Sequence, residues 1–187
     1  MTKAQAPAAQ RARGRTHLTA RRRDGKSVIV DLHQSGASRL LFPRASGQAM
    51  PAVWLNTSGG VTGGDQFSAH FGAEAGAHLS LTSQAAERIY RALPGEPGRV
   101  STTLNIAPGA RIDWLPQETI LFDRSALDRS LSIEMASDAT LLAVETLIFG
   151  RAAMGEIVRT LSLRDRIDLR IDGHLAFADR LRLDGDA

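Results

Sequence analysis

Apolar residues occupy every second position along much of this chain, and turn-forming residues interrupt the pattern roughly every ten residues. The alternation is clear in residues 100–106, 131–135 and 167–171, with turn signals at Pro108-Gly109 and Asp172-Gly173. Successive side chains of a β-strand point to opposite faces of its sheet, so this period is typical of strands with one buried face. We therefore expect an all-β domain, sandwich-like or solenoidal, although no internal repeat of fixed length is present.

One stretch departs from this period. Residues 83–93 (SQAAERIYRAL) have helical character and are followed by the breaker PGEPG at 94–98. We expect one short helical segment near residues 84–92 in an otherwise β body.

The sequence GAEAG at 72–76 separates two alternating runs and favours a β-hairpin. In a five-residue loop Phe71 would pair with Ala77, which places His70 directly opposite His78. Two imidazoles on adjacent strands are suited to nickel, zinc or copper. Because no third ligand is in sight, a pair of ordinary surface histidines is the simpler interpretation.

Positive charge is concentrated at the N-terminus. Residues 1–26 hold eight Lys or Arg and one Asp, whereas the rest of the chain holds 15 basic and 19 acidic residues. This segment predicts a basic disordered tail, followed by an all-β domain over residues 27–187. Such a tail could meet phosphates or an acidic partner, but the mildly acidic body argues against a nucleic-acid-binding domain.

Composition excludes several further classes. Cysteine is absent, which excludes a disulfide framework, a thiolate metal site and a cysteine nucleophile. The longest apolar run, residues 141–149, is too short for a membrane span and contains Glu145. No continuous apolar region follows the basic N-terminus, so we expect a cytoplasmic protein without a membrane partner.

The last predicted strand has no neighbour after it in the sequence. Residues 174–184 (HLAFADRLRLD) alternate strongly, and the chain stops three residues later. A long apolar edge strand promotes aggregation unless something covers it. We therefore expect that the chain is the N-terminal portion of a longer protein or that a partner covers this edge.

Residues 55–67 (LNTSGGVTGGDQF) contain two glycine pairs, Gly59-Gly60 and Gly63-Gly64, followed directly by Asp65. Glycine adopts positive φ without steric cost, so such pairs permit sharp turns or very close approach of another backbone or a ligand. The loop lacks the Lys-Ser/Thr end of a Walker A loop, the spacing of a dinucleotide site and a following helix. Tight turns for close packing are the favoured interpretation, and an amide cradle in an anion- or nucleotide-binding enzyme is the alternative.

Several carboxylates stand in apolar or turn-rich stretches, where burial is expected. They are Asp65, Glu87, Glu118, Asp123 and Glu145. Carboxylates in such places could act as acid and base, ligate a metal, or cap loop amides, and for any one alone capping or a surface ion pair is the commoner explanation. A hydrolase triad is not supported, because no GxSxG elbow occurs.

Three stretches, in this order and at this spacing, resemble the UreD family of urease accessory proteins, also called UreH. The family pattern T-x-G-G-x-x-G-G-D corresponds to Thr57–Asp65, T-T-Q-A-A-E-K-x-Y-R to Thr82–Arg91, and L-P-Q-E-x-I-x-F to Leu115–Phe122. Ser83 and Arg88 depart mildly, from a usual Thr and Lys. Besides the four glycines, the motif residues to which we assign a structural role are Gln84, Tyr90 and Gln117.

The resemblance implies a stacked-sheet, β-helix-like body of short strands and a role without catalysis. It implies a scaffold formed with the accessory protein UreF and the GTPase UreG on apo-urease, with nickel in transit rather than permanently bound. A path for a divalent ion needs acidic lining that offsets the lost hydration yet lets the ion leave. By position in the motifs, the resemblance implies Asp65, Glu87 and Glu118 as that lining, with Asp123 and Glu145 as weaker candidates.

Overall fold

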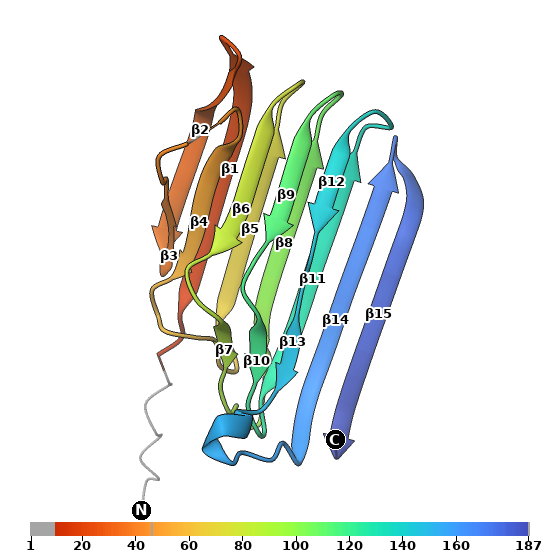
Figure 1. The fold of residues 1–187 in the computed structure, drawn as a ribbon. Helices are drawn as coiled ribbons and strands as arrows, with labels where there is room; N and C mark the ends of the chain where they lie inside the picture. Colours follow the sequence, from red (N-terminus) through yellow and green to blue (C-terminus); the bar gives the residue numbers. More distant parts are fainter. Residues whose placement is uncertain (1–9, 46, 187) are drawn as a thin grey trace, which may run out of the picture.

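The computed structural model describes residues 10–45 and 47–186, and almost every element in them is a β-strand. The strands form three sheets, and in each sheet the strands are stacked side by side along the same axis, as in a β-solenoid (Figure 1). The expectation of a mainly β, stacked-sheet body is confirmed. Within the described residues, no helix is long and apolar enough to cross a membrane.

Three sheets and one short helix make up the described fold. Sheet A contains, in spatial order, β15 (His174–Asp186), β14 (Thr160–Ile171), β11 (Ala126–Met135), β8 (Gly98–Ile106), β5 (Gln66–Ala73), β1 (Arg13–Arg23) and β2 (Lys26–Gly36). Sheet B contains β12 (Thr140–Ala143), β9 (Arg111–Leu115), β6 (His78–Ser83), β4 (Met50–Asn56) and β3 (Ser38–Leu41). Sheet C contains β13 (Leu147–Phe149), β10 (Thr119–Leu121) and β7 (Glu87–Ile89), and a 3₁₀ turn spans Ala152–Met154.

Each coil of the solenoid passes from sheet A through sheet B to sheet C. The coils are β5–β6–β7, β8–β9–β10 and β11–β12–β13, and strands of successive coils pair in parallel. In sheet A the register pairs Gln66 with Arg99, Arg99 with Asp128, and Asp128 with Arg164. The number of residues between register partners differs from coil to coil because the connecting loops differ in length. The sequence therefore shows no repeat of fixed length.

Antiparallel hairpins flank the parallel coils at both ends of sheet A. β14 and β15 are joined at Asp172-Gly173, where φ is 49° and 78°. β1 and β2 are joined at Asp24-Gly25, where φ is 50° and 78°. Two consecutive positive φ angles match the strand twist of a tight hairpin, which is why Asp-Gly is favoured there. The turn predicted at Asp172-Gly173 is confirmed, and it joins two antiparallel strands.

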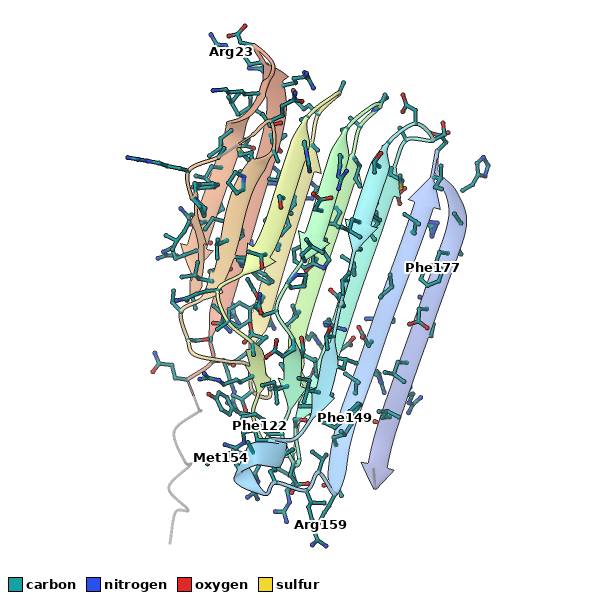
Figure 2. All side chains as sticks on the ribbon, viewed as in Figure 1. Arg23, Phe122, Phe149, Met154, Arg159 and Phe177 are labelled. Carbon is teal, nitrogen blue, oxygen red and sulfur yellow. The ribbon has the colours of Figure 1, made fainter. Side chains whose placement is uncertain are left out.

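Residues 13–26, which we expected to belong to a disordered tail, are ordered as β1 and the start of β2. Leu18 and Ala20 of β1 are fully buried, whereas Arg15 and Arg21 point to the outer face. Apart from Arg22 at the exposed end of the strand, the arginines of β1 stand on alternate positions, so they do not prevent a strand with one buried face. Arg23 lies at the tip of this hairpin (Figure 2). Residues 1–9, also assigned to the tail, lie outside the described residues.

The helix expected near 84–92 is absent from the described structure. Glu87–Ile89 form β7 instead, paired in parallel with β10. Ile89 is fully buried and forms an isolated bridge with Val61 of the glycine loop. Tertiary packing of a single buried side chain overrides the weak helix propensity of the Ala-containing stretch.

The hairpin expected around GAEAG is also wrong. β5 lies in sheet A and β6 in sheet B, so the chain turns a corner of the solenoid at residues 74–77. Phe71 and Ala77 are therefore not cross-strand partners, and His70 does not face His78. The two-residue period defines a strand with a buried face, but it does not identify the neighbouring strand.

The core lies between the sheets in two parts. Between sheets A and B, the larger cluster includes Leu18, Phe71, Leu79, Leu104, Ile112 and Trp114. Between sheets A and C, the smaller cluster includes Val61, Phe67, Ile89, Leu121, Leu127 and Leu163. Large apolar side chains of the last coil and its hairpin remain exposed, among them Phe149, Met154 and Phe177 (Figure 2).

Candidate functional site

The glycine loop is packed against β7. Val61 donates its N–H to the carbonyl of Arg88 and accepts the N–H of Tyr90, each at 2.8 Å. A Cβ at Gly60 would lie 2.4 Å from the Tyr90 ring and 2.6 Å from the Arg88 carbonyl oxygen, at a φ of 150°. A Cβ at Gly63 would lie 2.9 Å from a carbonyl oxygen. At both positions the backbone passes too close to its neighbours for a side chain.

Amides of this loop are engaged within the protein. Gly64 donates to the carbonyl of Pro97 at 3.2 Å, and Asp65 donates to that of Thr62 at 3.1 Å. The Thr62 amide in turn donates to the Asp65 carboxylate at 2.9 Å. Gly59 and Gly64 have φ of 82° and 85°, so they shape the turns. An anion cradle needs amides that converge on open space, and the internal bonding of these amides argues against one.

Asp65 is used to close the loop onto the first strand. Its Oδ1 accepts the Ala12 N–H at 2.8 Å and its Oδ2 accepts the Thr62 N–H at 2.9 Å. The residue is 4% exposed. Both oxygens cap backbone amides, and Asp65 does not line the cavity described below.

Asp123 and Glu118 also lie outside that cavity. Asp123 Oδ1 accepts the N–H groups of Arg159 and Thr160 at 2.8 and 3.1 Å, and these hydrogen bonds hold the pKa of its carboxyl below the usual range. They fix the start of β14. Glu118 is half-buried, and its backbone carbonyl accepts the N–H of Glu87 at 2.9 Å.

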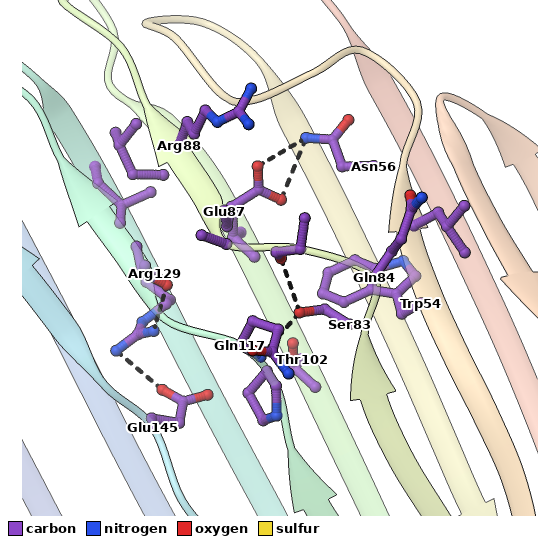
Figure 3. A pocket seen from close by; sticks show the side chains of 18 of the residues that line it. Trp54, Asn56, Ser83, Gln84, Glu87, Arg88, Thr102, Gln117, Arg129 and Glu145 are labelled. Carbon is purple, nitrogen blue, oxygen red and sulfur yellow. Dashed lines mark hydrogen bonds and ion pairs between the residues drawn. The ribbon is translucent and has the colours of Figure 1, made fainter.

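A cavity of about 260 Å³ lies at the junction of the two core clusters, and exposed lining residues such as Gln84 and Gln117 open it to the surface (Figure 3). Trp54 and Trp114 form part of its apolar wall. Its polar lining consists of Asn56, Ser83, Gln84, Glu87, Arg88, Thr102, Gln117, Thr119, Arg129, Ser130 and Glu145. Two of the five predicted carboxylates, Glu87 and Glu145, are thus brought to one cavity from different coils.

Glu87 lies at the start of β7. Asn56 Nδ2 donates to its two carboxylate oxygens at 3.1 and 3.3 Å (Figure 3). Burial raises the pKa of Glu87 to about 7, against the opposing effects of the Asn56 hydrogen bond and the nearby Arg88 charge. Near neutral pH this carboxyl group therefore exchanges between its protonated and charged forms.

Glu145 belongs to a buried charge cluster on the opposite part of the wall. Its Oε1 accepts the Trp114 indole N–H at 2.9 Å, and its Oε2 lies 2.9 Å from Nη2 of Arg129. Arg129 also binds Asp165 through two hydrogen bonds, Nε to Oδ1 and Nη2 to Oδ2. Burial alone would lower the pKa of Arg129, but the Asp165 hydrogen bonds and the charges of Glu145 and Asp165 outweigh it and raise the pKa.

Sequence reasoning missed Arg129 and Asp165, although the pattern holds a signal for both. Arg129 follows Leu127 and precedes Leu131 on the inward positions of β11, and Asp165 stands between Leu163 and Ile167 on those of β14. The two charged residues are direct register partners. A charged residue at an inward-facing position of an alternating strand needs a partner of opposite charge inside the protein. The positions of Arg129 and Asp165 in the alternating pattern could therefore have identified both from the sequence.

The histidines do not form the predicted pair. His70 stacks on His17 of β1 with ring centroids 4.7 Å apart, and His78 lies 2.7 Å from Asp113 of β9. Burial and the neighbouring His17 lower the pKa of His70. In residues 10–45 and 47–186 no group of three His, Asp or Glu side chains is arranged to hold a metal ion.

The cavity therefore offers carboxylate, amide and hydroxyl groups without a preformed resident metal site. Glu87 changes charge near neutrality, and Glu145 is already shared with Arg129. Oxygen ligands suit hard and borderline divalent cations, and few of them in a loose arrangement bind such ions weakly. A cavity of this kind can receive a cation and release it.

The comparison with known families shows to which family the chain belongs. A family profile described as "UreD urease accessory protein" matches residues 12–187. The chain belongs to the UreD family. The resemblance based on the three sequence motifs is thereby confirmed.

UreD proteins of several bacteria are close in sequence to this chain. It is 53% identical to the urease accessory protein UreD of Ruegeria sp. (strain TM1040) over 178 residues, which is 95% of this chain and 60% of that protein. It is 48% identical to UreD of Chelativorans sp. (strain BNC1) over 177 residues, 95% of this chain and 64% of that protein. With UreD of Ruegeria pomeroyi it shares 52% identity over 159 residues, 85% of this chain and 62% of that protein. The chain thus spans somewhat less than two thirds of these relatives.

Proposed function

We propose that this chain is a non-catalytic factor in urease maturation and that its cavity is part of the path of nickel in transit. Membership of the UreD family supports the first part of the proposal. The observation that carries the second is the convergence of Glu87, from the second family motif, and Glu145 on one cavity. Nickel is the cargo here rather than a resident cofactor.

The chemistry of the cavity suits transfer better than storage. A carboxyl group binds a metal ion only in its deprotonated form, so protons compete with the ion at Glu87. One carboxylate oxygen of Glu145, Oε2, is paired with the positive charge of Arg129. Both effects weaken binding at neutral pH, and a passing ion must be bound weakly enough to leave.

The proposed partners are apo-urease and UreF, with UreG reached through UreF. The test is affinity purification of the tagged protein from cells that express apo-urease and the other accessory proteins. Recovery of urease and UreF in stoichiometric amounts is the expected outcome, together with a urease nickel content that depends on the presence of the protein. Recovery of neither partner by folded protein, judged from its β-type circular dichroism, would refute the proposal.

A further inference from the structure

The buried charge cluster of Arg129, Glu145 and Asp165 places a cation at the wall of the cavity. We propose that Arg129 keeps the affinity of the cavity for divalent cations low, by occupying a carboxylate that would otherwise bind the ion. The inference rests on the proposed function. It assigns to Arg129 the weak binding that allows the cavity to release an ion.

Arg129 is held firmly on one side and loosely on the other. Its two hydrogen bonds to Asp165 form a bidentate pair, which fixes the plane of the guanidinium group. Toward Glu145 it makes a charge contact at 2.9 Å, yet Glu145 Oε2 is buried and accepts no hydrogen bond within the described structure. Glu145 Oε2 is thus the oxygen of the cluster that is least committed.

The cluster is well shielded from water, which strengthens its electrostatic effects. The side chains of Arg129 and Glu145 are each 11% exposed, and that of Asp165 is 9% exposed. Charges in such surroundings interact several-fold more strongly than in water. Arg88, the other basic residue of the lining, is exposed and more readily solvated.

The charge balance explains how such a cluster attracts an ion and still lets it go. Two carboxylates surround one guanidinium group, so the cluster carries an excess negative charge that favours a cation. An ion that approaches Glu145 Oε2 also meets the positive charge of Arg129, which Asp165 prevents from moving away. Repulsion between the two cations then limits how tightly the ion can bind.

The experiment uses a charge-matched double variant, Arg129→Gln/Asp165→Asn, in the full chain. It removes one positive and one negative charge, replaces the bidentate ion pair by two amides that can hydrogen-bond each other, and leaves Glu145 free. Binding of Ni²⁺ alone is measured by equilibrium dialysis with metal analysis. The affinity should rise roughly tenfold or more, because the guanidinium that contacts Glu145 Oε2 and repels the ion is gone while the net charge of the cluster is unchanged. A third substitution, Glu145→Gln, should abolish the rise.

A charge-retaining variant keeps the test decisive even if the double variant does not fold. Arg129→Lys retains the positive charge but loses the bidentate hydrogen bonds to Asp165, so its Ni²⁺ affinity should stay well below the tenfold gain of the double variant. The inference is overturned by a tenfold gain in the Lys variant, by an unchanged affinity in a folded double variant, or by a gain that survives Glu145→Gln.

The dialysis result is independent of urease, so the inference and the proposed function fail separately. If urease acquires its full nickel without the cavity carboxylates while the double variant still binds Ni²⁺ more tightly, the proposed function fails and the role of Arg129 stands. If cavity variants lower the urease nickel content while the affinity of the double variant is unchanged, the reverse holds.

Discussion

Replacing Glu87 by Gln should leave the free energy of unfolding almost unchanged at low pH and raise it at neutral and higher pH. The folded-state pKa of Glu87 is about 7, compared with 4.5 for an ordinary Glu. Between these values the folded state binds more protons than the unfolded state, so this group lowers stability as the pH rises from about 4.5 to about 7. Above that range its unfavourable contribution is complete and constant.

The magnitude follows from the shift. One pKa unit corresponds to about 1.4 kcal/mol, so a shift from 4.5 to about 7 makes the charged form cost about 3 kcal/mol of unfolding free energy. Glutamine is neutral at every pH and can still accept the hydrogen bond from Asn56. Glu87→Gln should therefore match the parent near pH 4.5 and exceed it by about 3 kcal/mol at pH 8.

The assay is urea denaturation of parent and variant across pH 4.5 to 8.5, followed by circular dichroism and by the fluorescence of Trp54 and Trp114. The quantity of interest is the difference between the two proteins, because other groups titrate equally in both. Glu134→Gln, on the exposed outer face of β11, is the matched control and should differ from the parent by less than about 0.5 kcal/mol. A Glu87→Gln difference that is constant with pH would refute the reasoning about burial.

Further predictions concern the glycine loop. Asp65→Ala removes the acceptor for the backbone amides of Ala12 and Thr62, so it should lower the free energy of unfolding in urea by about 2–4 kcal/mol. Asp65→Asn keeps one acceptor and should lower it by about half as much. Equal losses in the two variants would contradict the capping role. Gly60→Ala meets the backbone and a ring and should cost about 3 kcal/mol or more. Gly59→Ala, also at positive φ but with open space around it, should cost only about 1–2 kcal/mol, and a larger loss at Gly59 than at Gly60 in thermal unfolding would contradict the packing argument.

The strands were predictable because burial alternates along each of them. In β6, for example, Leu79 and Leu81 are fully buried between half-buried polar neighbours. The neighbours of each strand were not predictable, since the period of two is the same for a hairpin and for a solenoid corner. For that reason the sequence pattern favours His78 as the partner of His70, whereas in the fold His70 stacks on His17.

Misassignments at the N-terminus and near residue 87 have a common origin. Local composition, basic in residues 13–26 and Ala-containing in 83–93, outweighed the alternation that places Leu18, Ala20 and Ile89 in the core. Asp24-Gly25 carries the same hairpin signal that identified the turn at Asp172-Gly173. A periodic pattern of burial outranks composition when the two conflict.

The candidate site was only partly predictable. The sequence indicated Glu87 and Glu145 as unusual carboxylates, and the fold brings both to the cavity. Asp65 and Asp123 were marked by the same reasoning but cap backbone amides instead. Whether a carboxylate faces a cavity or a loop depends on three-dimensional neighbours that no local pattern specifies.

The most direct test of the central proposal is the nickel content of urease matured with cavity variants of this protein. Urease would be co-expressed with its accessory proteins and with either the parent, the Glu87→Gln/Glu145→Gln double variant, or the Glu134→Gln control. Nickel per urease would be measured after confirming equal recovery of the accessory complex. The account predicts a several-fold loss of nickel and activity with the double variant and none with the control. Full nickel occupancy with the double variant, at normal complex assembly, would contradict it.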